Sequence, residues 1–180
     1  ALRGKRHRIE PFSDDGVHKA TDGKESIYLC RRGRHNRYKR GVMAGVDALA
    51  RDYHLDAIAP FEGGTFIDCG ANVGELGFWA RARGMRYIAF EPEALEATCC
   101  DLNNFGGQST TIRKALWNEN TTLVFHSKPD SADSSLFEMA GSTDRIEVEA
   151  VALDSVIDIE DLPGPVIFKL EAEGAEPEVL

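Results

Sequence analysis

One segment, residues 66–77, constrains the fold more than any other part of the chain. It reads FIDCGANVGELG, an apolar strand that breaks at Gly70 and passes directly into a helix. In open α/β sheets this kind of strand-to-helix junction is where small cofactors bind. Dinucleotide binding through G-x-G-x-x-G requires a second glycine two residues after the first, so that the backbone can approach a pyrophosphate. Asn72 occupies that position, so NAD is not the expected cofactor.

The hydrophobic pattern predicts alternating strands and helices downstream of residue 63. Strands are expected at 65–69, 86–90, 110–116 and 166–170, with helices at 72–83 and 92–104. This order implies a parallel sheet with right-handed crossovers. Two further β segments, 121–126 and 146–153, flank a polar loop and are expected to form a hairpin-like insertion. The expected fold class is α/β.

Residues 1–62 are expected to form a leading segment, ahead of a cofactor-binding domain at 63–180. The segment begins as a turn-rich arm with room for a hairpin and continues into a short strand at 26–31. Apolar residues then recur at intervals near 3.6 from Val42 to Tyr53, which predicts an amphipathic helix. We expect this helix to flank or cover the main sheet.

Charge is distributed unevenly along the chain. Residues 1–41 carry 12 Lys/Arg and 5 Asp/Glu, whereas the remainder carries 9 and 25, within a net charge of −9. The basic run at 31–40 is either a docking site for phosphate, a nucleotide sugar or nucleic acid, or a solvated face. The acidic remainder argues against duplex DNA as the main partner, because phosphate contacts supply most of that affinity. Nucleic acid is therefore not the expected partner.

Cysteine content and hydropathy exclude several classes of protein. Four cysteines in 180 residues are too few for a disulfide scaffold, and none has the C-x-x-C spacing of a zinc site. We expect reduced thiols and no metal centre. No apolar run approaches the roughly 20 residues that cross a bilayer, and the first residues lack the apolar core of a signal peptide. A cytoplasmic protein with no membrane span is expected.

A carboxylate, Glu91, ends the second strand and precedes Pro92. The combination Asp68-x-Gly70-Ala71-Asn72-x-Gly74 with Glu91 at the next strand end resembles the cofactor site of S-adenosylmethionine-dependent methyltransferases. In such a site the glycines allow the turn and leave room for the cofactor, and Glu91 accepts hydrogen bonds from ribose hydroxyls. Asp68 either orders the loop or meets the cofactor's amino group. The structural alternatives are a helix cap for Asp68 and a helix-start anion for Glu91.

Further motifs occur in the order seen in the FkbM methyltransferase family. They lie at 66–77, 89–92, 114–117, 133–136, 151–154 and 169–180. The chain therefore resembles an FkbM-type methyltransferase from about residue 25 onward. The resemblance implies a Rossmann-like sheet with helices on both faces, S-adenosylmethionine as cofactor, and O-methylation of a sugar, glycan precursor or polyketide-like small molecule. It also implies that the end of the third strand, with Ala115 and Leu116, lies near adenine.

The sequence departs from the family pattern at Glu171, where the family usually has Asp in Lys-x-Asp-x-Glu-Gly. Strand alternation places Lys169, Glu171 and Glu173 on one face, with Glu171 near the expected methyl acceptor. A carboxylate there could position or deprotonate a hydroxyl, so Glu171 is the expected catalytic residue. The extra methylene leaves the choice between these two roles open, and a helix-start anion is the structural alternative.

The last predicted strand, 166–170, is expected to have an exposed edge. Methyltransferases of this fold continue for three more strands, whereas this sequence stops at Leu180. Since native proteins cover or pair such edges, we expect a longer natural polypeptide or a homo-oligomer in which a neighbouring chain shields the edge. Two rival functions stay open. They are a non-catalytic binding module that keeps the fold, and a nicotinamide-dependent oxidoreductase, which Asn72 disfavours.

Overall fold

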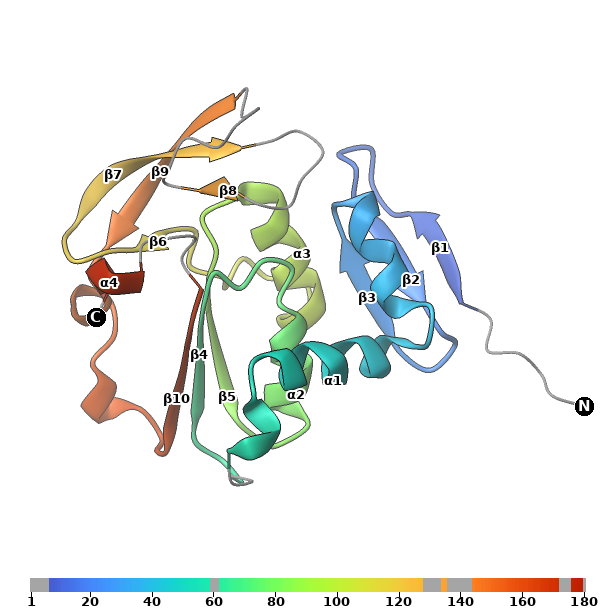
Figure 1. The fold of residues 1–180 in the computed structure, drawn as a ribbon, viewed down its shortest axis with the longest axis horizontal. Coiled ribbons are helices and arrows are strands. Elements are labelled where there is room, and N and C mark those ends of the chain that lie inside the picture. The colour runs from blue at the N-terminus through green and yellow to red at the C-terminus, as the bar shows by residue number, and fades with distance from the viewer. Residues whose placement is uncertain (1–6, 59–61, 128–133, 136–143, 172–175, 180) are drawn as a thin grey trace, which may run out of the picture.

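The computed structural model describes residues 7–58, 62–127, 134–135, 144–171 and 176–179. Figure 1 shows a mixed α/β fold with several small sheets. The strands, α-helices and 3₁₀ helices (η) are β1 (Arg8–Pro11), β2 (His18–Thr21), β3 (Ser26–Leu29), η1 (Arg32–Tyr38), α1 (Val42–Asp52), η2 (Leu55–Ala57), β4 (Thr65–Cys69), α2 (Glu75–Arg81), β5 (Arg86–Phe90), α3 (Ala94–Asn104), β6 (Ala115–Leu116), β7 (Thr121–Ser127), β8 (Ser134–Ser135), β9 (Asp144–Val151), η3 (Leu153–Ser155), η4 (Ile159–Asp161), β10 (Val166–Leu170) and α4 (Glu176–Val179).

The central sheet has the order β10-β4-β5, and all three strands are parallel. Their bounds confirm the strands predicted at 65–69, 86–90 and 166–170. A single parallel bridge from Phe90 to Ile112 extends the sheet beyond β5. Within the described residues β10 pairs with β4 alone, so it is an edge strand of this sheet.

The strand predicted at 110–116 is wrong over most of its length. The Asp101 carboxylate of α3 accepts hydrogen bonds from the backbone N–H groups of Thr110 and Thr111, at 3.0 and 2.8 Å, and from the Thr111 hydroxyl, at 2.7 Å. These donors are therefore not available to a neighbouring strand. The short strand that remains, β6, pairs in parallel with β9 rather than with the central sheet.

Helix α2 begins later than the predicted start at residue 72. Asn72 has φ 51° and Gly74 has φ 75°, so the chain passes through left-handed conformations before the helix can begin. Helix α3 likewise starts after Glu93 rather than at Pro92. Together with α1, these helices cover one face of the central sheet (Figure 1).

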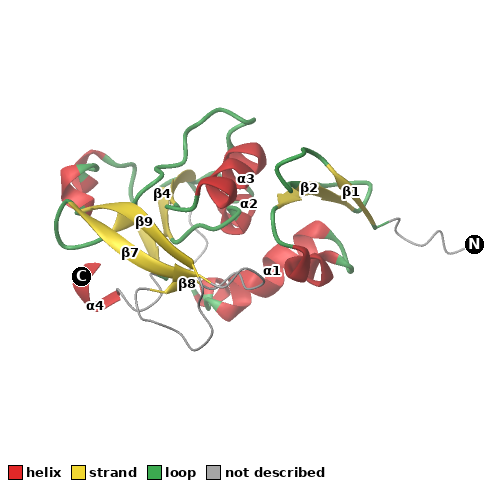
Figure 2. Cartoon of the chain, turned by 90° about the horizontal axis from the view of Figure 1, so that it is seen from above, coloured by secondary structure: helices red, strands yellow, loops and turns green. Residues whose placement is uncertain are grey.

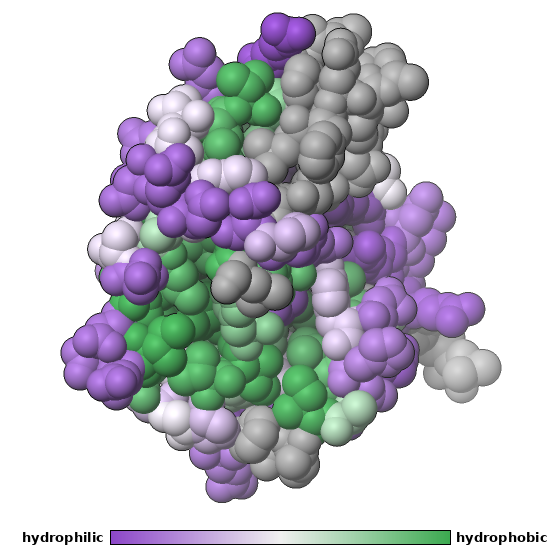
Figure 3. Space-filling model, turned by 60° about the vertical axis from the view of Figure 1, so that its left-hand side comes forward, coloured by the Kyte–Doolittle hydropathy of each residue, from purple (hydrophilic) through white to green (hydrophobic). Residues whose placement is uncertain are grey.

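The other face of the sheet is apolar and only partly covered. Alternate side chains of β10 point to this face, where they pack with Ile67 and Cys69 of β4 and with residues of the 153–162 segment. Figure 3 shows hydrophobic side chains gathered on the side of the molecule that carries β10. In the described residues this face is covered by η3, η4 and the short helix α4 rather than by long helices, which differs from the expectation of long helices on both faces.

The leading segment packs on α2 and α3, the helices that cover the central sheet. Strands β1, β2 and β3 form an antiparallel sheet, where the sequence predicted one strand and room for a hairpin. The predicted helix at 42–53 is present as α1. Tyr38, Val42 and Val46 are fully buried in one hydrophobic cluster with Phe66 and Trp79. The leading segment and the sheet thus share a core.

A second sheet, of order β6-β9-β7-β8, lies beyond the carboxyl ends of the central strands (Figure 2). The antiparallel pairing of β7 with β9 confirms the predicted hairpin-like insertion. The part of the chain described by the structure contains no helix long and apolar enough to cross a membrane.

Candidate functional site

A cavity of about 410 Å³ opens at the carboxyl ends of the central strands. Strands β7 and β10, helix α1 and η1 also contribute to its wall. It brings together nearly all of the residues predicted to bind cofactor or acceptor, namely Asp68, Gly70, Ala71, Asn72, Glu91, Ala115, Leu116 and Glu171. Gly74 is not among the lining residues, because it packs against α3.

The glycines of the turn are required by chain packing. Gly70 has φ +71°, and a Cβ there would lie 2.1 Å from the carbonyl oxygen of Glu171. Gly74 has φ +75°, and its Cβ would lie 2.3 Å from Nδ2 of Asn104. The expectation that these glycines permit the turn is confirmed. These contacts explain the two glycines by packing within the protein, and the expectation that they leave room for a cofactor stays a prediction.

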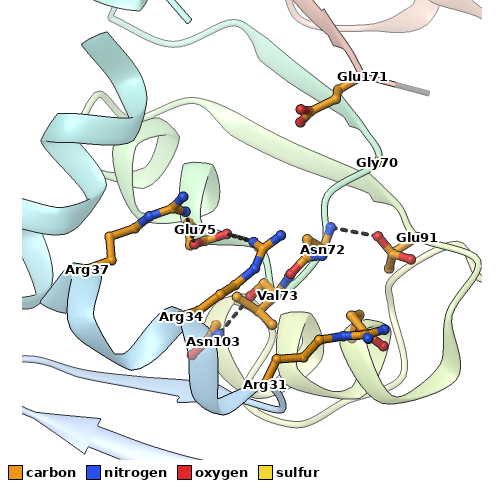
Figure 4. A network of polar contacts seen from close by, with 12 residues as sticks. Arg31, Arg34, Arg37, Gly70, Asn72, Val73, Glu75, Glu91, Asn103 and Glu171 are labelled. Atoms are coloured by element: carbon orange, nitrogen blue, oxygen red, sulfur yellow. Dashed lines mark hydrogen bonds and ion pairs between the residues drawn. The ribbon is translucent and has the colours of Figure 1, made fainter. Parts of the chain in front are cut away.

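Glu91 holds the glycine turn against the end of β5. Its Oε2 accepts a hydrogen bond from the N–H of Asn72 at 2.7 Å (Figure 4). Its Oε1 accepts one from the N–H of Glu93 at 2.9 Å. The residue is 6% exposed, and burial raises its pKa to about 8, although the two hydrogen bonds by themselves would lower this pKa. A carboxylate has about four acceptor positions, so roughly two remain for a ligand.

Asp68 and Lys169 form a buried ion pair between the ends of β4 and β10. The Lys169 Nζ lies 3.0 Å from Oδ1 of Asp68 and donates to the carbonyl oxygens of Gly70, at 2.7 Å, and Cys69, at 3.0 Å. The other Asp68 oxygen accepts from the Tyr87 hydroxyl at 2.7 Å. Burial alone would lower the pKa of Lys169, but Asp68 and its other neighbours raise it, so the ammonium is charged. Of the two roles considered for Asp68, these contacts favour loop ordering.

Glu171 follows β10 directly and lies on the same wall of the cavity as Lys169, as strand alternation predicts. Its Oε2 accepts a hydrogen bond from the Tyr53 hydroxyl and lies 3.4 Å from Lys169 Nζ, and the side chain is 51% exposed. Glu173 lies outside the described residues. The sequence placed Tyr53 on the packing face of a helix and among the residues that resemble the FkbM family, but neither pattern reveals what its hydroxyl contacts.

Three arginines of the basic run turn inward. Arg34 and Arg37 are three residues apart, the repeat of a 3₁₀ helix, and lie on one face of η1, whereas Arg31 directly precedes the helix with an extended backbone. Arg31 contacts Glu93 and Glu96 at 2.8 and 2.6 Å. Arg37 contacts Glu75 at 2.9 Å (Figure 4). The basic run is therefore more than a solvated face. Their three-residue spacing is the sequence signal that could have indicated this.

Two side-chain amides at the end of α3 donate hydrogen bonds to carbonyl oxygens of the glycine turn, and neither residue was predicted from the sequence. Asn103 Nδ2 donates to the Val73 carbonyl at 2.7 Å, and Asn104 Nδ2 donates to the Gly74 carbonyl at 2.9 Å. Asn103 also exchanges hydrogen bonds with the Tyr28 backbone at 2.8 and 3.0 Å. The turn is thus fixed by α3, Glu91 and Lys169 together.

Comparison with protein families agrees with this geometry. The family model of the methyltransferase FkbM domain matches residues 68–180, well over half of the chain. The chain belongs to the FkbM methyltransferase family. This confirms the resemblance seen in the motifs, and the matched FkbM region begins at Asp68 and contains the glycine turn, Glu91 and Glu171. Comparisons with curated proteins and with solved structures find no match.

The FkbM match leaves out the leading segment, which nevertheless contributes to the cavity. Arg34, Arg37 and Tyr53 all precede residue 68 and line the same space as Asp68 and Glu91. The candidate site of this FkbM methyltransferase is therefore built from both parts of the chain.

Proposed function

We propose that the chain is an S-adenosylmethionine-dependent O-methyltransferase with a Rossmann-like central sheet. The observation that carries this proposal is the buried carboxylate of Glu91, which lines the cavity and has acceptor positions left for a ligand. A hydrogen bond joins Glu91, at the end of β5, to the glycine turn that follows β4. The parallel order β10-β4-β5, extended by the bridge to Ile112, supports the Rossmann-like arrangement. Membership of the FkbM family supports methyl transfer as the reaction class.

The residues of the cavity fit the parts of this cofactor. Glu91 would accept hydrogen bonds from the ribose hydroxyls, and the apolar side chains of Leu116, Leu123 and Phe125 would contact adenine. The turn from Gly70 to Asn72 would bind the methionyl part. When bound, S-adenosylmethionine supplies a methyl group on a positively charged sulfur, which is a good leaving group.

Glu171 is placed in this proposal at the acceptor. It is the half-exposed carboxylate of the cavity wall, held by Tyr53 and Lys169 at the end of β10. We assign it the binding of an acceptor hydroxyl and the removal of its proton, in a sugar, glycan precursor or polyketide-like molecule. The protein's further contribution is to align the hydroxyl with the methyl group and to exclude water.

Methyl transfer itself is tested by incubating the chain with radiolabelled S-adenosylmethionine and a fractionated extract of glycans and small hydroxylated metabolites. The proposal predicts label in an alkali-stable methyl ether on one acceptor class. If the chain binds the cofactor but labels no fraction, the non-catalytic binding module becomes the better account.

Replacing Glu91 by alanine is expected to weaken binding of S-adenosylhomocysteine (SAH) by about 10- to 150-fold above pH 8, where Glu91 is charged. This is the effect of losing hydrogen bonds to a charged group, worth roughly 1.5–3 kcal/mol. Isothermal titration calorimetry measures it, and Asp52→Ala, which changes another carboxylate of the cavity wall, is the matched control. Unchanged affinity in Glu91→Ala rules out the ribose assignment.

Binding of SAH is expected to strengthen as pH rises from 6 to 8. Burial raises the pKa of Glu91 to about 8 in the free protein, so much of it is protonated below that pH. Ribose hydroxyls donate to the charged carboxylate, so binding releases a proton, and affinity rises by up to about tenfold per pH unit below pH 8. Titrations across this range check the slope, which Glu91→Gln should flatten. An equal slope in wild type and Glu91→Gln contradicts this role.

A further inference from the structure

Two arginines of the leading segment share one buried counter-ion at the cavity. Glu75 is 3% exposed, and its Oε1 accepts hydrogen bonds from the Tyr38 hydroxyl at 2.5 Å and from Arg37 Nη1 at 2.9 Å. Its Oε2 lies 3.6 Å from Arg34 Nη1. Figure 4 shows both guanidinium groups directed at Glu75, with Glu91 beyond Asn72 on the other side of the turn.

This cluster has an excess of positive charge. The ion pairs found among the described residues set two guanidinium groups against the single carboxylate of Glu75. Over the same residues Arg34 makes no side-chain hydrogen bond, and Arg37 interacts with Glu75 and Tyr38, although each guanidinium has five N–H donors. Their side chains are 24% and 36% exposed and line the cavity, so the unused donors are accessible to a ligand.

Among the described residues, two other cations line the cavity, Lys169 and Lys114. Lys169 is occupied by Asp68 and by the carbonyl oxygens of Cys69 and Gly70. Lys114 pairs with Glu149 at 2.9 Å beside β6, at the adenine side of the proposed site. Lys169 is thus occupied and Lys114 lies at the adenine side, so an anionic group at the opposite end of the cavity would meet Arg34 and Arg37.

We propose that Arg34 and Arg37 bind the carboxylate at the methionyl end of the cofactor, with Glu75 and Tyr38 holding the guanidinium groups in position. The inference rests on the proposed function, which places the ribose at Glu91 and the methionyl part along the turn. A carboxylate at the opposite end of the ligand from adenine then meets the arginine pair. Guanidinium and carboxylate match in charge and in their planar, two-pronged geometry.

The test compares two ligands that differ by one group: SAH and S-adenosyl-3-thiopropylamine, which is SAH without its carboxylate. The calorimetry is carried out without any acceptor, so that binding of an anionic acceptor to the arginines cannot contribute to the measured affinity. We expect the wild type to bind SAH about 10- to 100-fold more tightly than the amine. In Arg34→Gln/Arg37→Gln this preference should fall below about threefold, while affinity for the amine stays within about twofold of wild type. Arg40→Gln, an exposed arginine of the same basic run, is the control.

A purely structural role of the arginines would weaken both ligands equally, and that result overturns the inference. So does a wild-type protein that binds both ligands with the same affinity. The single variant Arg34→Gln, whose contact with Glu75 is the longer one, repeats the test with less disturbance of the buried carboxylate. Failure of the wild type to bind either ligand contradicts the proposed function itself, and is thereby distinguished from failure of this inference alone.

Discussion

Replacing Lys169 by methionine is expected to lower the free energy of unfolding by about 3–5 kcal/mol. Lys169 is 7% exposed and Asp68 is 1% exposed, so the substitution leaves a buried carboxylate without its cation. It also removes the donor to the Gly70 and Cys69 carbonyls. Methionine is close to lysine in volume, which limits the contribution of a cavity. Urea denaturation followed by circular dichroism measures the loss.

Lys114→Met is the matched control for this prediction. Lys114 also forms an ion pair, with Glu149, but the two side chains are 40% and 71% exposed. Such surface pairs contribute less than about 1 kcal/mol, so this variant should remain close to wild type. Adding Asp68→Asn to Lys169→Met removes the uncompensated charge and should recover part of the stability. Equal losses in Lys169→Met and Lys114→Met would contradict the role assigned to the buried pair.

Replacing Glu171 by glutamine is expected to slow methyl transfer by about 10²- to 10⁴-fold, the usual contribution of a general base. Glutamine keeps the size of the side chain and can still accept the hydrogen bond from Tyr53, but it cannot take a proton. Affinity for SAH should stay within about twofold, because Glu171 is placed at the acceptor rather than the cofactor. The initial rate of label transfer from radiolabelled S-adenosylmethionine into the acceptor fraction measures the effect.

Asp52→Asn provides the control for Glu171, because it neutralises another carboxylate that lines the cavity. Its rate should fall by no more than about threefold. If Glu171→Gln also retains most of its rate while Glu171→Ala loses it, Glu171 positions the acceptor hydroxyl without taking its proton.

The strands of the central sheet were predictable because each is a short apolar run with a clear stop. Residues 65–69 end at Gly70 and residues 86–90 end before Glu91 and Pro92, and both bounds are confirmed. The start of α2 was not predictable from the spacing of apolar residues. That spacing continues past Asn72 and does not reveal the left-handed backbone conformation of this residue. The strand predicted at 110–116 was wrong for another reason. The backbone N–H groups at the start of this segment donate hydrogen bonds to the carboxylate of Asp101, on another element.

In the candidate site, too, some residues could be predicted from the sequence and others could not. The glycine turn and Glu91 follow from their places at the carboxyl ends of neighbouring parallel strands, so the sequence alone brings them together. Arg34, Arg37 and Tyr53 reach the cavity only because the leading segment packs against α2 and β10. Those contacts join residues far apart in the chain, and no local pattern encodes them.

The central claim, that the glycine turn and Glu91 hold S-adenosylmethionine, is tested most directly by titrating the wild-type chain with SAH in a calorimeter, with NADH as the comparison ligand. The account predicts saturable binding of SAH at one site per chain, competed by S-adenosylmethionine, and no binding of NADH. Binding of NADH, or no binding of SAH at millimolar concentration, would contradict it.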